Sequence, residues 1–166
     1  MKGVSCLLLL AASLAAQPAS ENQANANAVR KLNSTLLTLK DGVSRFSVGQ
    51  QLAADIASVA DPDHRPSQKN VRQLADQLTV SLSGGHLRMD LLSQVTTPIV
   101  EVLQSAGTST IGFYESVGRA EKALTSMGVA APTARRIAET LKAIGMQVRG
   151  PEDFPVDGVP GWRFRP

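Results

Sequence analysis

The chain has 166 residues, of which 43% are hydrophobic, 19% charged and 4% aromatic, and its formal net charge is +3. This length and composition predict one domain, with or without a tail, and exclude a wholly disordered chain and a polytopic membrane protein. The single cysteine and two histidines exclude an intramolecular disulfide framework, a cysteine-rich zinc module and most histidine-rich metal or catalytic sites.

The first fifteen residues have the layout of a secretory signal. Lys2 supplies a positive charge, a leucine-rich apolar run follows, and small residues at the spacing of a cleavage site end at Ala15. The run is much shorter than the roughly 20 apolar residues of a membrane-spanning helix. We therefore expect residues 1–15 to be a signal peptide. The alternative is an alanine-rich or buried N-terminal helix.

The position of Cys6 supports the secretory interpretation over a lipoprotein signal. A lipidated cysteine follows the apolar run, whereas Cys6 precedes it and would leave with the signal. The mature chain would then contain no cysteine, so its fold would depend on packing alone in an oxidising compartment. We expect it to be periplasmic or extracellular, with no transmembrane segment.

Between Ala24 and Ile144 the apolar residues recur every three or four positions, which is the spacing that places side chains on one face of a helix. This pattern predicts an all-α bundle of five to six amphipathic helices over residues 16–150. The six apolar stripes are Val29, Leu32, Leu36, Leu39 and Val43; Val48, Leu52, Ile56 and Val59; Val71, Leu74, Leu78 and Leu82; Leu87, Leu91, Leu92, Val95, Ile99, Val102 and Leu103; Phe113, Val117, Ala120, Leu124 and Met127; and Ala134, Ile137, Ala138, Leu141 and Ile144.

Turn and cap residues separate the first three stripes. Asp41-Gly42 should end or bend the first helix, and Asp61-Pro62-Asp63 should end the second. Ser67 is expected to be the N-cap of the third helix. Gly84-Gly85 is expected to close that helix in the left-handed conformation.

Proline and glycine also divide the later stripes. Pro98 should kink or divide the fourth helix, or begin a new one. Gly107 should end that stretch, and Pro132 should lie in the first turn of the last helix. Gly145 is expected to end the last helix. The small residues around Gly112 and Gly118 are expected to allow close helix packing.

Residues 151–166 differ in composition from the rest of the chain. They contain four of the nine prolines and three of the six aromatic residues, so we expect an extended tail rather than a helix. The tail can lie across the bundle and cover a seam between helices, or it can bind a partner, because rings interleaved with arginines are enriched in binding hot spots. An anionic surface is a weaker alternative. The candidate binding residues are Phe154, Trp162, Arg163, Phe164 and Arg165.

The sequence contains few candidate catalytic or metal-binding residues. Asp61, Asp63 and His64 cluster in one turn, but the further acidic ligands of a calcium loop are absent and the turn needs no metal. His86 and Asp90 are spaced for a helical surface pair. The chain has no Gly-x-Ser-x-Gly motif, phosphate loop or dinucleotide fingerprint. We therefore assign no metal, cofactor or catalytic residue.

One segment carries a local family resemblance. Met127-Gly128-Val129-Ala130, followed by Pro132–Ile137, resembles the hairpin of helix-hairpin-helix DNA-binding modules, although Ala130 stands where that family has a second glycine. The resemblance implies a phosphate-binding corner over residues 124–141, with Gly128, Arg135 and Arg136 in contact with nucleic acid.

Together these patterns favour an exported, non-enzymatic helical protein that acts through protein–protein contacts, with another protein or by self-association. The tail and one helical stripe would be the contact surfaces. The alternative is a nucleic-acid-binding protein that uses the corner at residues 124–141.

Overall fold

The computed structural model describes residues 16–106 and 110–149, and it describes side-chain burial from residue 23 onward. The expected signal peptide, Gly107 and the C-terminal tail lie outside the described residues. Within them the chain forms helices and no strand, which confirms the predicted all-α bundle. The helices are α1 (Ala16–Leu37), α2 (Arg45–Val59), α3 (Gln68–Leu82), α4 (Leu92–Leu103), α5 (Thr110–Met127) and α6 (Ala131–Arg149), with a short 3₁₀ helix, η1 (Met89–Leu91), before α4.

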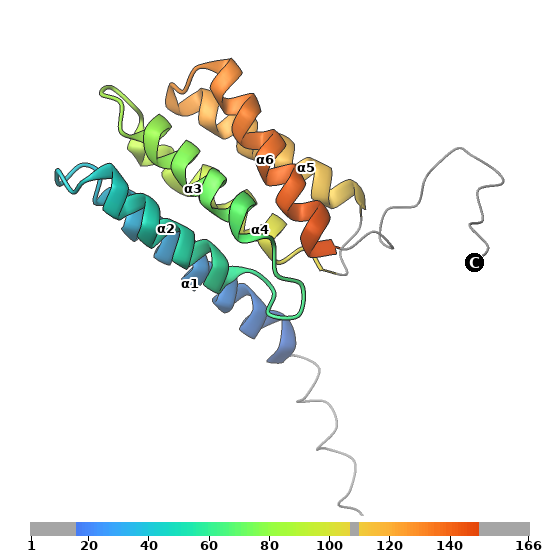
Figure 1. Cartoon of the computed structure of the whole chain (residues 1–166). Coiled ribbons are helices and arrows are strands. Elements are labelled where there is room, and N and C mark those ends of the chain that lie inside the picture. The colour runs from blue at the N-terminus through green and yellow to red at the C-terminus, as the bar shows by residue number, and fades with distance from the viewer. Residues whose placement is uncertain (1–15, 107–109, 150–166) are drawn as a thin grey trace, which may run out of the picture.

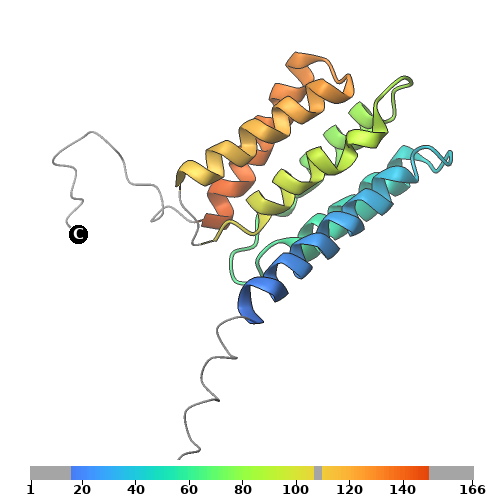
Figure 2. The ribbon, with the colours of Figure 1, turned by 180° about the vertical axis from the view of Figure 1, so that it is seen from behind.

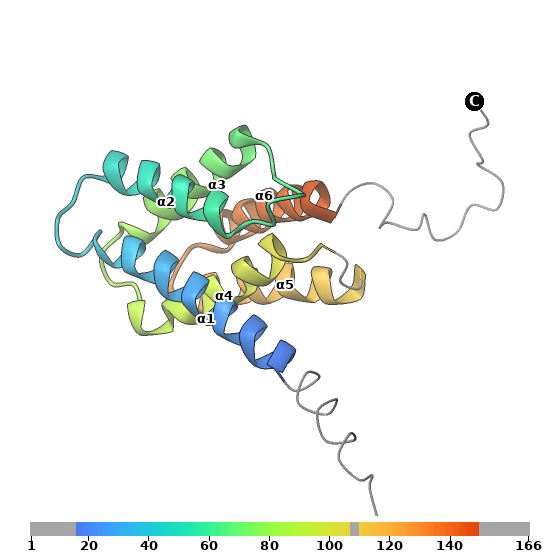
Figure 3. The ribbon, with the colours of Figure 1, turned by 90° about the horizontal axis from the view of Figure 1, so that it is seen from below.

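The six α-helices form two layers of three (Figure 3). One layer contains α1, α4 and α5, and the other contains α2, α3 and α6. Helices α1 and α2, α3 and α4, and α5 and α6 form three antiparallel hairpins, and the turns within these hairpins all lie at one end of the bundle (Figures 1 and 2). Consequently α2 ends, α3 begins and α6 ends at the opposite end.

The aliphatic stripes form one continuous core between the layers. Every residue of the second, third, fifth and sixth predicted stripes is buried. The first stripe extends less far than predicted, since α1 ends at Leu37 and a turn follows in which Gly42 has a φ of +79°. Leu39 is therefore only half-buried, and Val43 is 44% exposed.

The caps of α3 show one correct and one wrong prediction. Ser67 is the N-cap, and its Oγ accepts a hydrogen bond from the backbone N–H of Asn70 at 3.3 Å. The expected left-handed closure at Gly84-Gly85 is wrong. The helix ends on Ser83 with a right-handed φ of −85°, and the positive φ, +73°, falls on His86 instead.

Pro98 does not divide the fourth helix. α4 runs without interruption from Leu92 to Leu103, with the ring of Pro98 buried on its core side. Proline removes only one hydrogen bond of the helix, the one to the carbonyl of Gln94 in the first turn. The burial of the ring and of the surrounding apolar stripe offsets that loss.

Two glycines have roles opposite to those expected. Gly145 does not end α6, which continues to Arg149; a Cβ at Gly145 would lie 2.0 Å from Cε2 of Phe113 and 2.8 Å from Cγ1 of Val102. Gly118 is exposed, and a Cβ there would meet no atom within 4 Å. The close contact between α5 and α6 therefore depends on Gly145, not on Gly118.

Candidate functional site

An apolar groove of about 730 Å³ runs between α2 and α3 on the outer face of the bundle. Small residues of α2 and Val71 of α3 line it, Phe46 stands at one end, and Arg65 and Pro66 lie at the other. The groove therefore extends along most of the length of α2. It is the candidate binding site of the described residues.

The groove results from a second stripe on α2, beside the core stripe. Phe46, Gly49, Ala53 and Ala57 follow one another by three or four positions and thus share a helix face. A Cβ at Gly49 would lie 3.2 Å from Oδ1 of Asp76, so α3 approaches α2 closely at this point. The short side chains further along the stripe leave the surface between the helices hollow.

Phe46 is the most exposed large hydrophobic residue of the described chain, at 75%. Val80 of α3 is also largely exposed, at 62%. Burying an aliphatic or aromatic side chain of this size contributes roughly 1.5–3 kcal/mol. Apolar surface left open beside a groove is typical of interaction sites.

Charged side chains border the apolar floor of the groove. Arg65 and Arg72 lie on the α3 side, together with Asp76. None of these three residues forms an ion pair with another residue in the described part of the chain. Their charges are therefore available to a ligand that lies in the groove.

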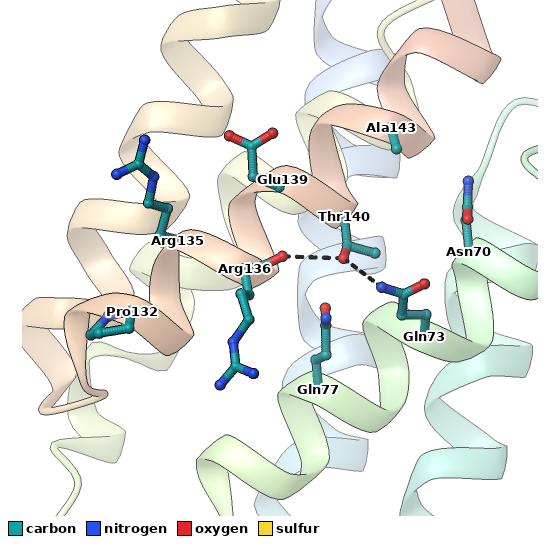
Figure 4. Close-up of a pocket in the computed structure, with 9 residues that line it drawn as sticks. All are labelled: Asn70, Gln73, Gln77, Pro132, Arg135, Arg136, Glu139, Thr140 and Ala143. Atoms are coloured by element: carbon teal, nitrogen blue, oxygen red, sulfur yellow. Dashed lines mark hydrogen bonds between the residues drawn. The ribbon is translucent and has the colours of Figure 1, made fainter.

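A second groove lies between α3 and α6 (Figure 4). Nε2 of Gln73 donates to Oγ1 of Thr140 at 3.2 Å, and that hydroxyl donates to the carbonyl of Arg136 at 3.1 Å. Oε1 of Gln77 is buried there and accepts no hydrogen bond from the described residues. The groove also contains Arg135 and Arg136, so the arginines named by the helix-hairpin-helix resemblance lie beside it.

The corner between α5 and α6 is a Schellman cap. Gly128 has a φ of +105°, its N–H donates to the carbonyl of Thr125, and the N–H of Val129 donates to the carbonyl of Leu124, both at 3.0 Å. Two hairpin amides are thus already paired with α5. In the nucleic-acid alternative, phosphate contacts would have to come mainly from the exposed side chains of Arg135 and Arg136.

The two other candidate clusters in loops are explained by local hydrogen bonds. Oδ1 of Asp61 accepts from the N–H of Asp63 at 2.8 Å, as in an Asx turn. No group of three or more histidine, cysteine or acidic side chains in the described ranges is arranged to hold a metal ion. Asp90 pairs with Arg88 rather than with His86: Nη2 of Arg88 donates to Oδ2 at 2.8 Å. This hydrogen bond lowers the pKa of the Asp90 carboxyl.

A buried carboxylate that was not predicted from the sequence lies between α1 and α2. Asp55 is 2% exposed and accepts hydrogen bonds from Oγ1 of Thr35 at 2.5 Å and Nε2 of Gln51 at 2.9 Å. Nζ of Lys31 lies 3.5 Å from its Oδ1. The signal was present in the sequence, because Asp55 occupies a core-facing position three residues after Leu52 and four before Val59.

A second polar cluster joins α4 to α5. The hydroxyl of Ser116 donates to Oε2 of Glu101 at 2.8 Å, and the guanidinium of Arg119 forms an ion pair with the same carboxylate. Like the Asp55 cluster, it connects neighbouring helices. We therefore interpret both clusters as structural.

The tail residues proposed from the sequence, Phe154, Trp162, Arg163, Phe164 and Arg165, lie outside the described residues. Among the helices that are described, none is both long and apolar enough to span a bilayer. No protein-family model matches the sequence, and comparisons with curated proteins and with solved structures give no match.

Proposed function

We propose that this chain is an exported, non-enzymatic helical protein that binds a segment of another protein in the groove between α2 and α3. The observation that carries the proposal is the exposure of Phe46, at 75%, beside an apolar groove of about 730 Å³. Export is supported by the leucine-rich N-terminal segment and its small-residue cleavage site.

The groove indicates the chemistry of its ligand. Its floor of glycine and alanine accommodates protruding apolar side chains, and Phe46 offers a ring against which they can pack. Arg65 and Arg72 favour carboxylates, since neither forms an ion pair within the described residues. The ligand is therefore an extended apolar segment with acidic residues near one end.

The test compares two matched substitutions of exposed helical alanines. Ala54→Lys introduces a long charged side chain into the groove, whereas Ala26→Lys places the same change on α1, in the other layer. Each protein is purified from the exported fraction, where its intact mass should correspond to a chain that begins at Ala16. A partner recovered with the wild type is then purified and titrated against both variants.

We expect Ala54→Lys to weaken the affinity at least about tenfold, equivalent to about 1.4 kcal/mol, and Ala26→Lys to leave it unchanged. Equal binding by both variants would show that the groove is not the contact surface. Sedimentation of the wild type alone distinguishes self-association from binding to another protein. Salt-dependent retardation of duplex DNA would favour the nucleic-acid alternative if the double substitution Arg135→Gln/Arg136→Gln abolished it.

A further inference from the structure

We propose that the C-terminal segment 151–166 of the same chain occupies the α2–α3 groove and masks it until a partner displaces it. This inference rests on the proposed function, because it concerns the same groove. It identifies the first occupant of the groove and implies that binding of a partner is competitive.

The end of α6 lies next to the end of the groove. The backbone N–H of Ser67 donates to Oε1 of Gln147 at 2.9 Å, which ties the start of α3 to the last turns of α6. Arg65 and Pro66, two residues and one residue before Ser67, line the groove. The end of α6 therefore lies beside the start of α3 (Figure 1), close to the end of the groove that Arg65 and Pro66 line.

The length of the segment is sufficient to cover the groove. From Phe46 to Ala57 the helix rises about 17 Å at about 1.5 Å per residue. An extended chain covers about 3.3 Å per residue, so residues 150–166 can span roughly 55 Å. The segment can reach Phe46 from Arg149 and still bend, so occupancy within one molecule needs no second copy.

The apolar composition of the segment suits the groove. Its prolines favour an extended backbone that loses little conformational entropy on binding. Between them stand apolar residues that can enter a floor of glycine and alanine. These residues are Phe154, Val156, Val159, Trp162 and Phe164.

The order of charges along the segment matches the groove. The acidic residues Glu152, Asp153 and Asp157 precede Arg163 and Arg165, so a segment that enters at the Arg65 end brings its carboxylates first to Arg65 and Arg72, which form no ion pair within the described residues. A segment that ran in the opposite direction would place like charges together. The tether also raises the effective concentration of the segment to roughly the millimolar range.

Trp162 is the single tryptophan of the chain, so its fluorescence reports on the segment alone. In the full-length mature protein we expect blue-shifted emission and protection from acrylamide, independent of protein concentration. Ala54→Lys should shift both readings to those of the isolated peptide 151–166. Arg72→Glu should produce a partial shift, and the Ala26→Lys control should produce none.

Several outcomes would overturn the inference. They are wild-type emission equal to that of the free peptide, emission unaffected by Ala54→Lys, and protection that depends on protein concentration, which would indicate exchange between copies. Circular dichroism melting of each variant establishes that it is folded. Ala54→Lys would leave the emission unaffected if the segment lay instead against other exposed apolar residues, such as Ile111, Tyr114 or Met146.

Partner affinity separates this inference from the proposed function. If the segment masks the groove, Trp162→Ala should increase affinity for the partner, while Ala54→Lys decreases it. Groove-dependent partner binding without protection of Trp162 would refute only the inference. If Trp162 is protected but Ala54→Lys leaves the affinity for the partner unchanged, only the proposed function is refuted.

Discussion

At the scale of single residues, two glycines inside neighbouring helices show how environment decides the effect of one methyl group. Gly145 faces Phe113 and Val102 across the α5–α6 and α4–α6 contacts, and a Cβ there would overlap the phenyl ring. Gly118 is exposed on α5 with open space around it. Both residues lie in helix interiors, so their intrinsic helix propensities are the same and only the neighbours differ.

Gly145→Ala should therefore destabilise the protein by about 1–3 kcal/mol, because the added methyl group overpacks the core. Gly118→Ala is the matched control and should stabilise by about 0.5–1 kcal/mol, since alanine loses less backbone entropy in a helix. Urea unfolding followed by circular dichroism measures both free energies of unfolding. Equal effects of the two substitutions would contradict the close approach of Phe113 to Gly145.

At the scale of the element, α2 carries three different surfaces. One face is the aliphatic core stripe, a second is the small-residue stripe of the groove, and Asp55 lies at the contact with α1. The side chain of Asp55 joins the two helices through Thr35 and Lys31. A sliding of α1 along α2 would deprive this buried carboxylate of Thr35 and Lys31 and leave it only Gln51 of its own helix, so the cluster favours one register of the first hairpin.

Asp55→Ala should destabilise the protein by about 1.5–3 kcal/mol, the usual contribution of hydrogen bonds to a charged group. Asp90→Ala removes an exposed carboxylate with its own arginine partner and should change the melting temperature little. Thermal and urea unfolding of both variants provides the comparison. Comparable losses for both would mean that the Asp55 cluster contributes no more than a surface ion pair.

At the scale of the whole molecule, the two-layer arrangement makes the contribution of each helix to the core unequal. α4 packs against α1, α5 and α6, and α6 packs against α3, α4 and α5, so each of them contacts at least three other α-helices. α1 lies at the edge, against α2 and α4. Among its side chains from residue 23 onward, the first buried one is Ala28, and those of residues 23–27 are exposed or half-buried.

Hydrogen exchange should reflect this difference. Backbone amides of α1 before Ala28 should exchange through local opening, whereas those in the middle of α4 and α6 should exchange only through global unfolding. Exchange measured by mass spectrometry at increasing low concentrations of urea separates the two classes, because only global opening depends strongly on denaturant. Uniform protection along α1 would indicate that its first turns are covered.

Local sequence patterns determined the all-helical class, the positions of the aliphatic stripes and the Ser67 cap, because periodicity and capping depend on residues within one or two turns. The tertiary structure decided what those patterns leave open. It placed Phe113 against Gly145, gave Asp55 its donors from α1, and kept α4 continuous through Pro98. It also created the groove beside Phe46, where short side chains of α2 face α3. A hollow between two helices depends on how closely they approach and on which of their faces meet.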